Sequence, residues 1–275
     1  MITGLSTSLS RQIRRAIYYP RRETLLGQLE QAASSGLRPW RDADDNFIGW
    51  RSKRATRQRA NRLLVFHGNE GCALDRADFV HQMERLRGSL WEVYLFEYPG
   101  YGAKAGIPSE AAFKRAAAGA ARFLLHDKSR LFVMGESIGT GVASYIAGRF
   151  SCSIPGLLLI TPFDRFVDAA RNNTTVWLPP WLAVERYDNG VALRRYKGRL
   201  ATVLAKKDTV VPAWSGEKLF NSYNGPKQLW VDPQASHNTV AKSSAPWWCE
   251  APAFLLNYHA KPKSRTRRTN RCPWH

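Results

Sequence analysis

At 131–139 the chain reads Leu131-Phe132-Val133-Met134-Gly135-Glu136-Ser137-Ile138-Gly139, and this segment is the clearest indication of its fold. Four apolar residues typical of a buried strand lead directly into a GxSxG motif at 135–139, and the Gly- and Ala-rich pattern of Ile138–Arg149 indicates a helix behind it. A strand, a sharp turn and a helix in this order form a nucleophile elbow, in which a serine stands on a strained turn. Glycines are expected on both sides because larger side chains there would collide with neighbouring backbone.

Short apolar runs and amphipathic helical patterns alternate on both sides of this motif. The runs predict strands at Leu63–Phe66, Val93–Phe96, Leu131–Met134, Leu157–Ile160, Thr202–Leu204 and Leu229–Val231, each buried on both faces of a sheet. The patterns predict helices at Arg76–Arg87, Ser109–His126, Ile138–Arg149 and Trp214–Tyr223. This alternation predicts an α/β fold with a mostly parallel central sheet flanked by helices. Ahead of it, Leu37–Trp40 and Phe47–Trp50 flank a polar turn and predict an antiparallel hairpin.

The composition fits one domain of this class. The chain has 275 residues, of which 44% are hydrophobic and 23% charged, and this length and apolar content exclude global disorder and fibrous repeats. Its longest apolar runs are far shorter than the ~20 residues that cross a bilayer, so no transmembrane helix is expected. The four cysteines form no CxxC pair, and we expect free thiols at Cys72, Cys152, Cys249 and Cys272.

Both ends of the chain carry a basic segment. The formal net charge is +19, and five arginines precede the first acidic residue, Glu23. We therefore divide the chain into a basic leader at 1–36, packed loosely on the domain, a domain at 37–260, and a disordered basic tail at 261–275. We expect weak, salt-sensitive contact of these ends with polyanions or anionic membranes, and no specific nucleic-acid recognition. The expected location is cytoplasmic, with a peripheral-membrane or organelle-targeted protein as the alternative.

A serine hydroxyl needs a general base before it becomes a nucleophile, and six histidines are candidates. His237 is favoured because it lies in a polar loop directly after the predicted strand Leu229–Val231. The loops that follow the carboxyl ends of the strands carry the functional groups of an open α/β sheet. His67, which ends the predicted strand Leu63–Phe66, is interpreted as structural.

The imidazole in turn needs a carboxylate to fix its tautomer. Asp208 follows the predicted strand Thr202–Leu204, and it gives the chain order serine, aspartate, histidine with Ser137 and His237. Asp164 follows the preceding predicted strand and is the alternative. We favour Asp208 over Asp164.

Two backbone N–H groups must face the developing negative charge on a substrate carbonyl oxygen. The motif His67-Gly68-Asn69 ends a predicted strand and offers one such group, which we assign to Asn69. The second is assigned to Ile138, immediately after Ser137.

Over residues 37 to 258 the chain resembles the α/β-hydrolase superfamily, on four ordered motifs. These are His67-Gly68-Asn69, the GxSxG at 135–139, Lys207-Asp208-Thr209-Val210-Val211-Pro212 and Ala235-Ser236-His237-Asn238. Tyr98-Pro99-Gly100-Tyr101-Gly102, Gly106-Ile107-Pro108-Ser109-Glu110 and Thr161-Pro162-Phe163-Asp164 look like the small-esterase and serine-aminopeptidase-like branch. The resemblance implies the fold and acyl-enzyme chemistry of that superfamily.

These features predict a serine hydrolase that cleaves a small or medium carboxylic ester through Ser137, Asp208 and His237. A short cap at about 162–198, with Trp177-Leu178-Pro179-Pro180-Trp181, is expected to leave the pocket open. Thioesterase or peptidase activity on the same residues, and a noncatalytic binding protein, remain alternatives. We expect no cofactor and no metal, because no HExxH, CxxC or calcium-loop spacing occurs.

Overall fold

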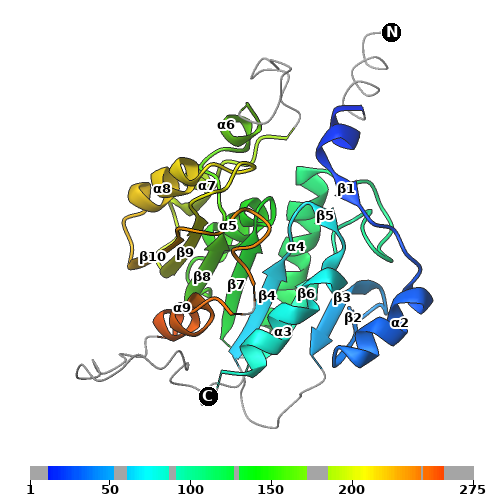
Figure 1. Ribbon diagram of the computed structural model, residues 1–275. Helices are drawn as coiled ribbons and strands as arrows, with labels where there is room; N and C mark the ends of the chain where they lie inside the picture. Colours follow the sequence, from blue (N-terminus) through cyan, green and yellow to red (C-terminus); the bar gives the residue numbers. More distant parts are fainter. Residues whose placement is uncertain are drawn as a thin grey trace.

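A twisted sheet of eight strands forms the centre of the described part of the chain (Figure 1). The computed structural model describes residues 12–52, 61–86, 91–126, 130–171, 185–242 and 244–256. The strands lie in the order β10-β9-β8-β7-β4-β6-β3-β2. They span β2 (Leu37–Arg41), β3 (Phe47–Ser52), β4 (Asn61–Phe66), β6 (Trp91–Phe96), β7 (Leu131–Glu136), β8 (Gly156–Ile160), β9 (Arg199–Ala205) and β10 (Lys227–Asp232). All neighbours from β10 to β6 are parallel, while β3 is antiparallel to both β6 and β2. The predicted α/β class and the predicted hairpin are therefore confirmed.

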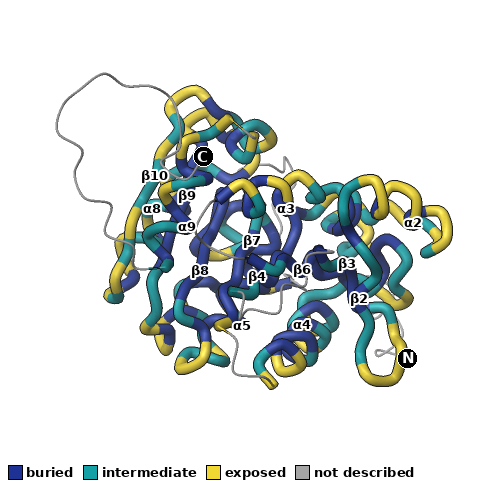
Figure 2. Tube along the Cα trace, turned by 90° about the horizontal axis from the view of Figure 1, so that it is seen from below, coloured by how far each residue is buried: buried dark blue, intermediate teal, exposed yellow. Residues whose placement is uncertain are grey.

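Helices cover both faces of this sheet. They are α2 (Leu25–Ser34), α3 (Ala77–Glu84), α4 (Glu110–Leu125), α5 (Gly139–Arg149), α6 (Phe166–Arg171), α7 (Asn189–Leu193), α8 (Ala213–Ser222) and α9 (Trp247–Leu255), with a 3-10 turn η1 at Ala73–Arg76. In Figure 2, α3 and α9 lie on one side of the buried strands, and α4 and α5 lie on the other. The start of α4 is fixed by Ser109, whose hydroxyl accepts a hydrogen bond from the Ala112 N–H at 3.2 Å.

The core is divided in two by the sheet, because successive side chains of a strand point to opposite faces. In β7, Leu131 and Val133 pack into the cluster that contains side chains of α4 and α5. Phe132 and Met134 pack into the cluster under α3 and α9. Burial on both faces is thus confirmed for this central strand. It is wrong for β10, which lies at the sheet edge and leaves Val231 exposed.

The described part of the expected leader packs into the domain. Residues 12–17 are helical, and β1 (Tyr19–Pro20) pairs in parallel with β5 (Glu70–Gly71). Tyr18 is buried in the main core cluster, and its hydroxyl donates to Glu185 Oε2 at 2.9 Å. Loose packing is therefore not what the described residues 12–36 show. Residues 1–11 and the basic tail at 261–275 lie outside the described residues.

The cysteines differ in state. Cys72 and Cys152 are free, whereas Cys249 is disulfide-bonded, so the expectation of free thiols is wrong for Cys249. Across the described ranges, no helix has both the length and the apolar character that a membrane span requires.

Candidate active site

Ser137 stands on a strained turn at the carboxyl end of β7. Its φ of 52° lies in the left-handed region, which costs energy for a residue with a side chain. The two motif glycines allow this turn for steric reasons. A Cβ on Gly135 would lie 2.6 Å from the Gly139 carbonyl oxygen, and one on Gly139 would lie 2.2 Å from the Phe66 carbonyl oxygen. The turn therefore holds the serine between β7 and α5, as a nucleophile elbow requires.

The structure brings Ser137, His237 and Asp208 together across 100 residues of sequence. His237 Nε2 lies 3.0 Å from Ser137 Oγ, and His237 Nδ1 lies 2.7 Å from Asp208 Oδ2. The Asp208 side chain is almost fully buried, while that of His237 is 13% exposed. Ser137 follows β7, Asp208 follows β9 and His237 follows β10, so three strand ends supply the three side chains.

The Asp208 carboxylate is held in place by backbone as well as by the histidine. Its Oδ1 accepts hydrogen bonds from the N–H groups of Val210 at 2.8 Å and Val211 at 2.7 Å. This leaves Oδ2 directed at the imidazole. The alternative carboxylate, Asp164, instead pairs with Lys218 at 2.6 Å. The geometry thus places Asp208 and not Asp164 beside His237.

The two amides assigned to the oxyanion follow neighbouring strands of the sheet, Asn69 after β4 and Ile138 after β7. Neither the Asn69 N–H nor the Ile138 N–H has an acceptor among the described residues, which is compatible with the assignment of both to the oxyanion. Asn69 itself is fixed from two sides. Its side-chain amide donates to the Ile17 carbonyl oxygen, and its own carbonyl oxygen accepts from the Tyr101 hydroxyl at 2.8 Å. Ile17 belongs to the predicted leader at 1–36, so this segment contacts Asn69 directly.

His67 is enclosed, in keeping with a structural role. It is 1% exposed, and its Nδ1 lies 2.8 Å from the Gly68 carbonyl oxygen. Its own carbonyl oxygen accepts a hydrogen bond from the Tyr98 hydroxyl at 2.8 Å. These contacts hold the end of β4, which precedes Gly68 and Asn69.

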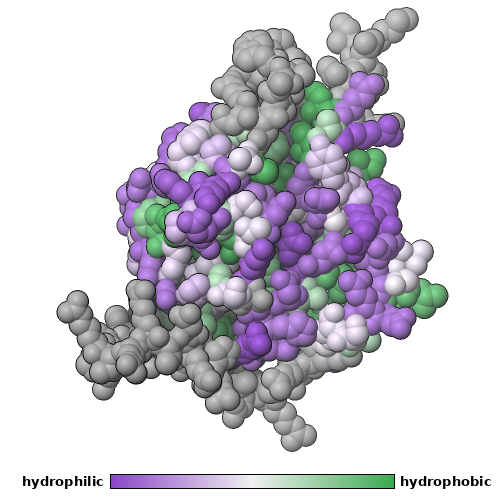
Figure 3. Space-filling view, viewed as in Figure 1, coloured by the Kyte–Doolittle hydropathy of each residue, from purple (hydrophilic) through white to green (hydrophobic). Residues whose placement is uncertain are grey.

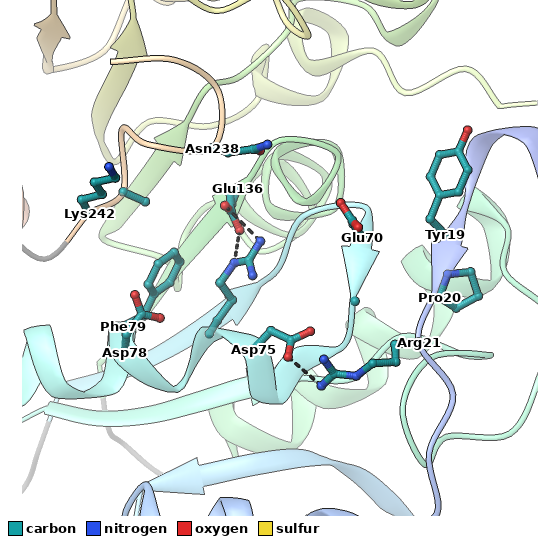
Figure 4. A pocket seen from close by; sticks show the side chains of 13 residues that line it. Tyr19, Pro20, Arg21, Glu70, Asp75, Asp78, Phe79, Glu136, Asn238 and Lys242 are labelled. Atoms are coloured by element: carbon teal, nitrogen blue, oxygen red, sulfur yellow. Dashed lines mark hydrogen bonds and ion pairs between the residues drawn. The ribbon is translucent and has the colours of Figure 1, made fainter. Parts of the chain in front are cut away.

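A charged pocket of about 720 Å³ lies beside the elbow (Figure 4). Two of its lining residues, Glu136 and Asn238, are direct chain neighbours of Ser137 and His237. Two ion pairs cross its wall, Arg76 with Glu136 and Arg21 with Asp75. Sequence reasoning missed the first pair, because Glu136 fills an unspecified position of the GxSxG motif and Arg76 lies 60 residues away. An acidic side chain at the end of an apolar strand was the available signal.

Burial and charge act in opposite directions on Arg76. Burial lowers the pKa of its guanidinium, but the adjacent Glu136 carboxylate raises it, and the net pKa is above the ordinary arginine value. Asp78 lines the same pocket, and burial raises the pKa of its carboxyl despite the nearby Arg76. The Arg76 guanidinium therefore keeps its charge in a partly desolvated place beside Glu136.

The predicted cap is described only in part. Phe166–Arg171 forms α6 and Asn189–Leu193 forms α7. The tryptophan-containing stretch at 177–181 lies outside the described residues. For metals, the described ranges contain no group of three or more His, Cys, Asp or Glu side chains that could hold an ion.

Comparisons with known proteins agree with this architecture, although no family model matches the chain. It is 30% identical over 251 residues to "Uncharacterized protein MT2364" of Mycobacterium tuberculosis, covering 86% of this chain and 84% of the relative. It is 27% identical over 237 residues to the lysophosphatidylserine lipase ABHD12 of Danio rerio, covering 74% of this chain and 60% of that protein.

Among solved structures, the esterase Pf2001 of Pyrococcus furiosus superposes with a TM-score of 0.65 at 16% identity. The superposition covers 87% of this chain and 97% of the esterase chain. Sheet order, elbow and relatives lead to one conclusion: this chain belongs to the α/β-hydrolase superfamily.

Proposed function

We propose that the protein is a serine hydrolase that cleaves small or medium carboxylic esters through an acyl-enzyme on Ser137. The observation that carries the proposal is the continuous chain of contacts from Ser137 Oγ through His237 to Asp208, at 3.0 Å and 2.7 Å. Both lie within the range expected between a nucleophile, its base and the group that orients the base.

In the first half of the reaction, Ser137 Oγ attacks the ester carbonyl carbon while His237 Nε2 takes the hydroxyl proton. Asp208 stabilises the imidazolium that forms, and the Asn69 and Ile138 N–H groups donate to the carbonyl oxygen as it becomes negative. The carbon–oxygen bond to the alcohol then breaks, and His237 gives its proton to the leaving alkoxide. The acyl group remains on Ser137.

In the second half, water replaces the alcohol. His237 takes a proton from the water, whose oxygen attacks the acyl carbon, and the bond to Ser137 Oγ breaks as the proton returns to the serine. The ester and water are the only reactants consumed, and neither half involves oxidation or reduction.

Two observations favour esters over other acyl compounds as substrates: the quality of the leaving group and the name of one relative. An alcohol is a better leaving group than an amine, and the name of the ABHD12 relative refers to a lipid whose acyl chain is held by an ester. Thioesters and peptides are the alternatives on the same three side chains. A hydrolase-like binding protein is the noncatalytic alternative.

The test is turnover of p-nitrophenyl esters from acetate to hexadecanoate, with lysophosphatidylserine and a thioester beside them. We expect turnover greatest on short and medium esters, abolition of turnover in Ser137→Ala, and acyl mass on the Ser137 peptide after acid quench. A rate that rises steadily to the longest chain contradicts the size preference. No Ser137-dependent turnover of any acyl compound by folded protein contradicts the hydrolase itself.

A further inference from the structure

Glu136 links the elbow to the loop that carries Asn69. It is the last residue of β7 and directly precedes Ser137. The register of β4 and β7 ends with Phe66 opposite Gly135. Beyond that pair, a side chain and not the backbone connects the two strand ends. The Glu136 Oε2 accepts a hydrogen bond from the Gly68 N–H at 3.2 Å. The Glu136 side chain thus links the end of β7 to Gly68, the residue directly before Asn69.

Arg76 donates a hydrogen bond to each of the two oxygens of this carboxylate. Its Nε donates to Glu136 Oε2 at 2.5 Å, and its Nη2 donates to Glu136 Oε1 at 3.2 Å. Such a two-point contact fixes the orientation of a carboxylate more firmly than a single bond does. Both residues line the charged pocket, Arg76 at the end of η1 and Glu136, labelled in Figure 4, at the end of β7.

The charge of Glu136 also matters to the proposed reaction. A carboxylate adjacent to Ser137 repels the negative charge that develops on the substrate oxygen, and this repulsion is stronger in a partly desolvated site. The Arg76 guanidinium cancels it. Of the other two cations in the pocket, Arg21 pairs with Asp75, and Lys242 is solvent-exposed.

We propose that Arg76 and Glu136 are positioning residues of the hydrolase. Glu136 fixes the backbone that presents the Asn69 N–H to the oxyanion, and Arg76 orients Glu136 and neutralises it. The inference rests on the proposed function, because a positioning role requires the reaction that it serves.

The test compares Arg76→Met, Glu136→Gln and the double variant with wild type. Arg76→Met leaves the carboxylate without its counter-ion, and we expect kcat to fall at least about tenfold with KM within about twofold. Glutamine keeps an oxygen acceptor for the Gly68 N–H but carries no charge. The double variant is therefore expected to recover most of the kcat that Arg76→Met loses.

A transition-state analogue separates positioning from a general structural effect. A trifluoromethyl ketone adds Ser137 Oγ to its carbonyl and places a negative oxygen between the two amides. Its Ki is expected to rise in Arg76→Met by about the factor by which kcat falls, because both report oxyanion stabilisation. Fluorophosphonate titration run to completion counts the active sites, so that kcat refers to folded molecules.

The matched control is Arg62→Met. Arg62 pairs with Glu92 between β4 and β6, and the two side chains are 17% and 14% exposed, against 24% and 13% for Arg76 and Glu136. This pair lies at the amino ends of the strands, away from the elbow. We expect Arg62→Met to lower stability and to leave kcat per active site within about twofold of wild type.

Four results with the single variants overturn the proposal. They are an unchanged kcat in Arg76→Met, a loss confined to KM, a Ki that does not follow kcat, and an equal loss of kcat in Arg62→Met. A double variant no faster than Arg76→Met contradicts the role of the charge, and so overturns it as stated. If wild type shows neither ester turnover nor labelling at Ser137, the proposed function fails first and the positioning role fails with it.

Discussion

At the scale of the residue, the two candidate carboxylates differ in their partners. Asp208 is nearly enclosed, and its two oxygens are divided between backbone N–H groups and His237. Asp164 faces Lys218, whose side chain is 53% exposed, so its ion pair lies in contact with solvent. Both follow a strand, and only the side-chain contacts distinguish them.

Replacing each aspartate by asparagine is therefore expected to give opposite results. Asp208→Asn favours the wrong tautomer of His237, and we expect a fall in kcat of about 10³- to 10⁴-fold, as for the equivalent change in a serine protease triad. Asp164→Asn is expected to leave kcat within about threefold of wild type. Steady-state kinetics on one ester checks both, and a larger loss at Asp164 would reverse the assignment.

Lys104 makes stability depend on pH. Burial lowers the pKa of its ammonium group from 10.5 to about 8, although Glu97 opposes this. Between these two values the unfolded chain binds more protons than the folded one, so stability rises with pH through this range. The contribution of Lys104 is fully present above pH 10.5 and is lost as the pH falls through about 8.

Urea unfolding of wild type and Lys104→Met from pH 7 to pH 10.5 tests this statement. We expect the difference in unfolding free energy between the two proteins to shift in favour of wild type as the pH rises. Taking the difference removes other groups that titrate in the same range, such as Cys72, for which burial raises the pKa to about 11. A difference that does not vary with pH would show that Lys104 titrates normally in the folded protein.

At the scale of the element, the start of α5 packs against the end of β4 without space for a side chain. A Cβ on Gly139 would lie 2.2 Å and 2.6 Å from the Phe66 and His67 carbonyl oxygens. Gly119 in α4 is different, because a Cβ there meets nothing within 4 Å. The two glycines therefore form a matched pair within helices.

We expect Gly139→Ala to lower the free energy of unfolding by about 1–3 kcal/mol, because backbone on both sides must move. Gly119→Ala is expected to raise it by about 0.5–1 kcal/mol through helix propensity alone. Urea denaturation monitored by circular dichroism gives both values. Equal effects at the two positions would mean that α5 does not lie this close to β4.

Local sequence patterns predicted the helices and strands well, and α4 shows why. The helix predicted at Ser109–His126 is found at Glu110–Leu125, with Ser109 as its cap, because capping and amphipathic spacing are properties of neighbouring residues. The contact between Arg76 and Glu136 was not predictable in this way. It depends on which strand ends meet, and the helix predicted at Arg76–Arg87 begins only at Ala77, after a 3-10 turn that places Arg76.

For the molecule as a whole, the packing of the amino-terminal segment could not be predicted from the net charge of +19. On the face of the described residues seen in Figure 3, hydrophilic residues predominate, with smaller hydrophobic groups between them. Tyr18 is nevertheless buried, and Arg14 and Tyr18 both contact Glu185, which lies within the predicted cap range 162–198. A basic composition indicates solubility and charge, and it does not indicate packing.

The neighbouring residues Tyr18 and Tyr19 test this packing. Tyr18 is 3% exposed and Tyr19 is 59% exposed. We expect Tyr18→Ala to cost about 3–5 kcal/mol of unfolding free energy, as large-to-small core substitutions do, and Tyr19→Ala to cost under about 1 kcal/mol. Similar small losses in both variants would show that the segment is only loosely attached to the domain.

Whether Ser137 is an activated nucleophile is tested by covalent labelling of the purified protein with a fluorophosphonate probe, followed by identification of the modified peptide by mass spectrometry. We expect labelling at Ser137, its absence in Ser137→Ala, and much slower labelling in His237→Gln, because the probe reacts with a hydroxyl activated by a base. Folded wild-type protein that remains unlabelled, or that is labelled at another residue, would contradict the central claim that Ser137 is an activated nucleophile.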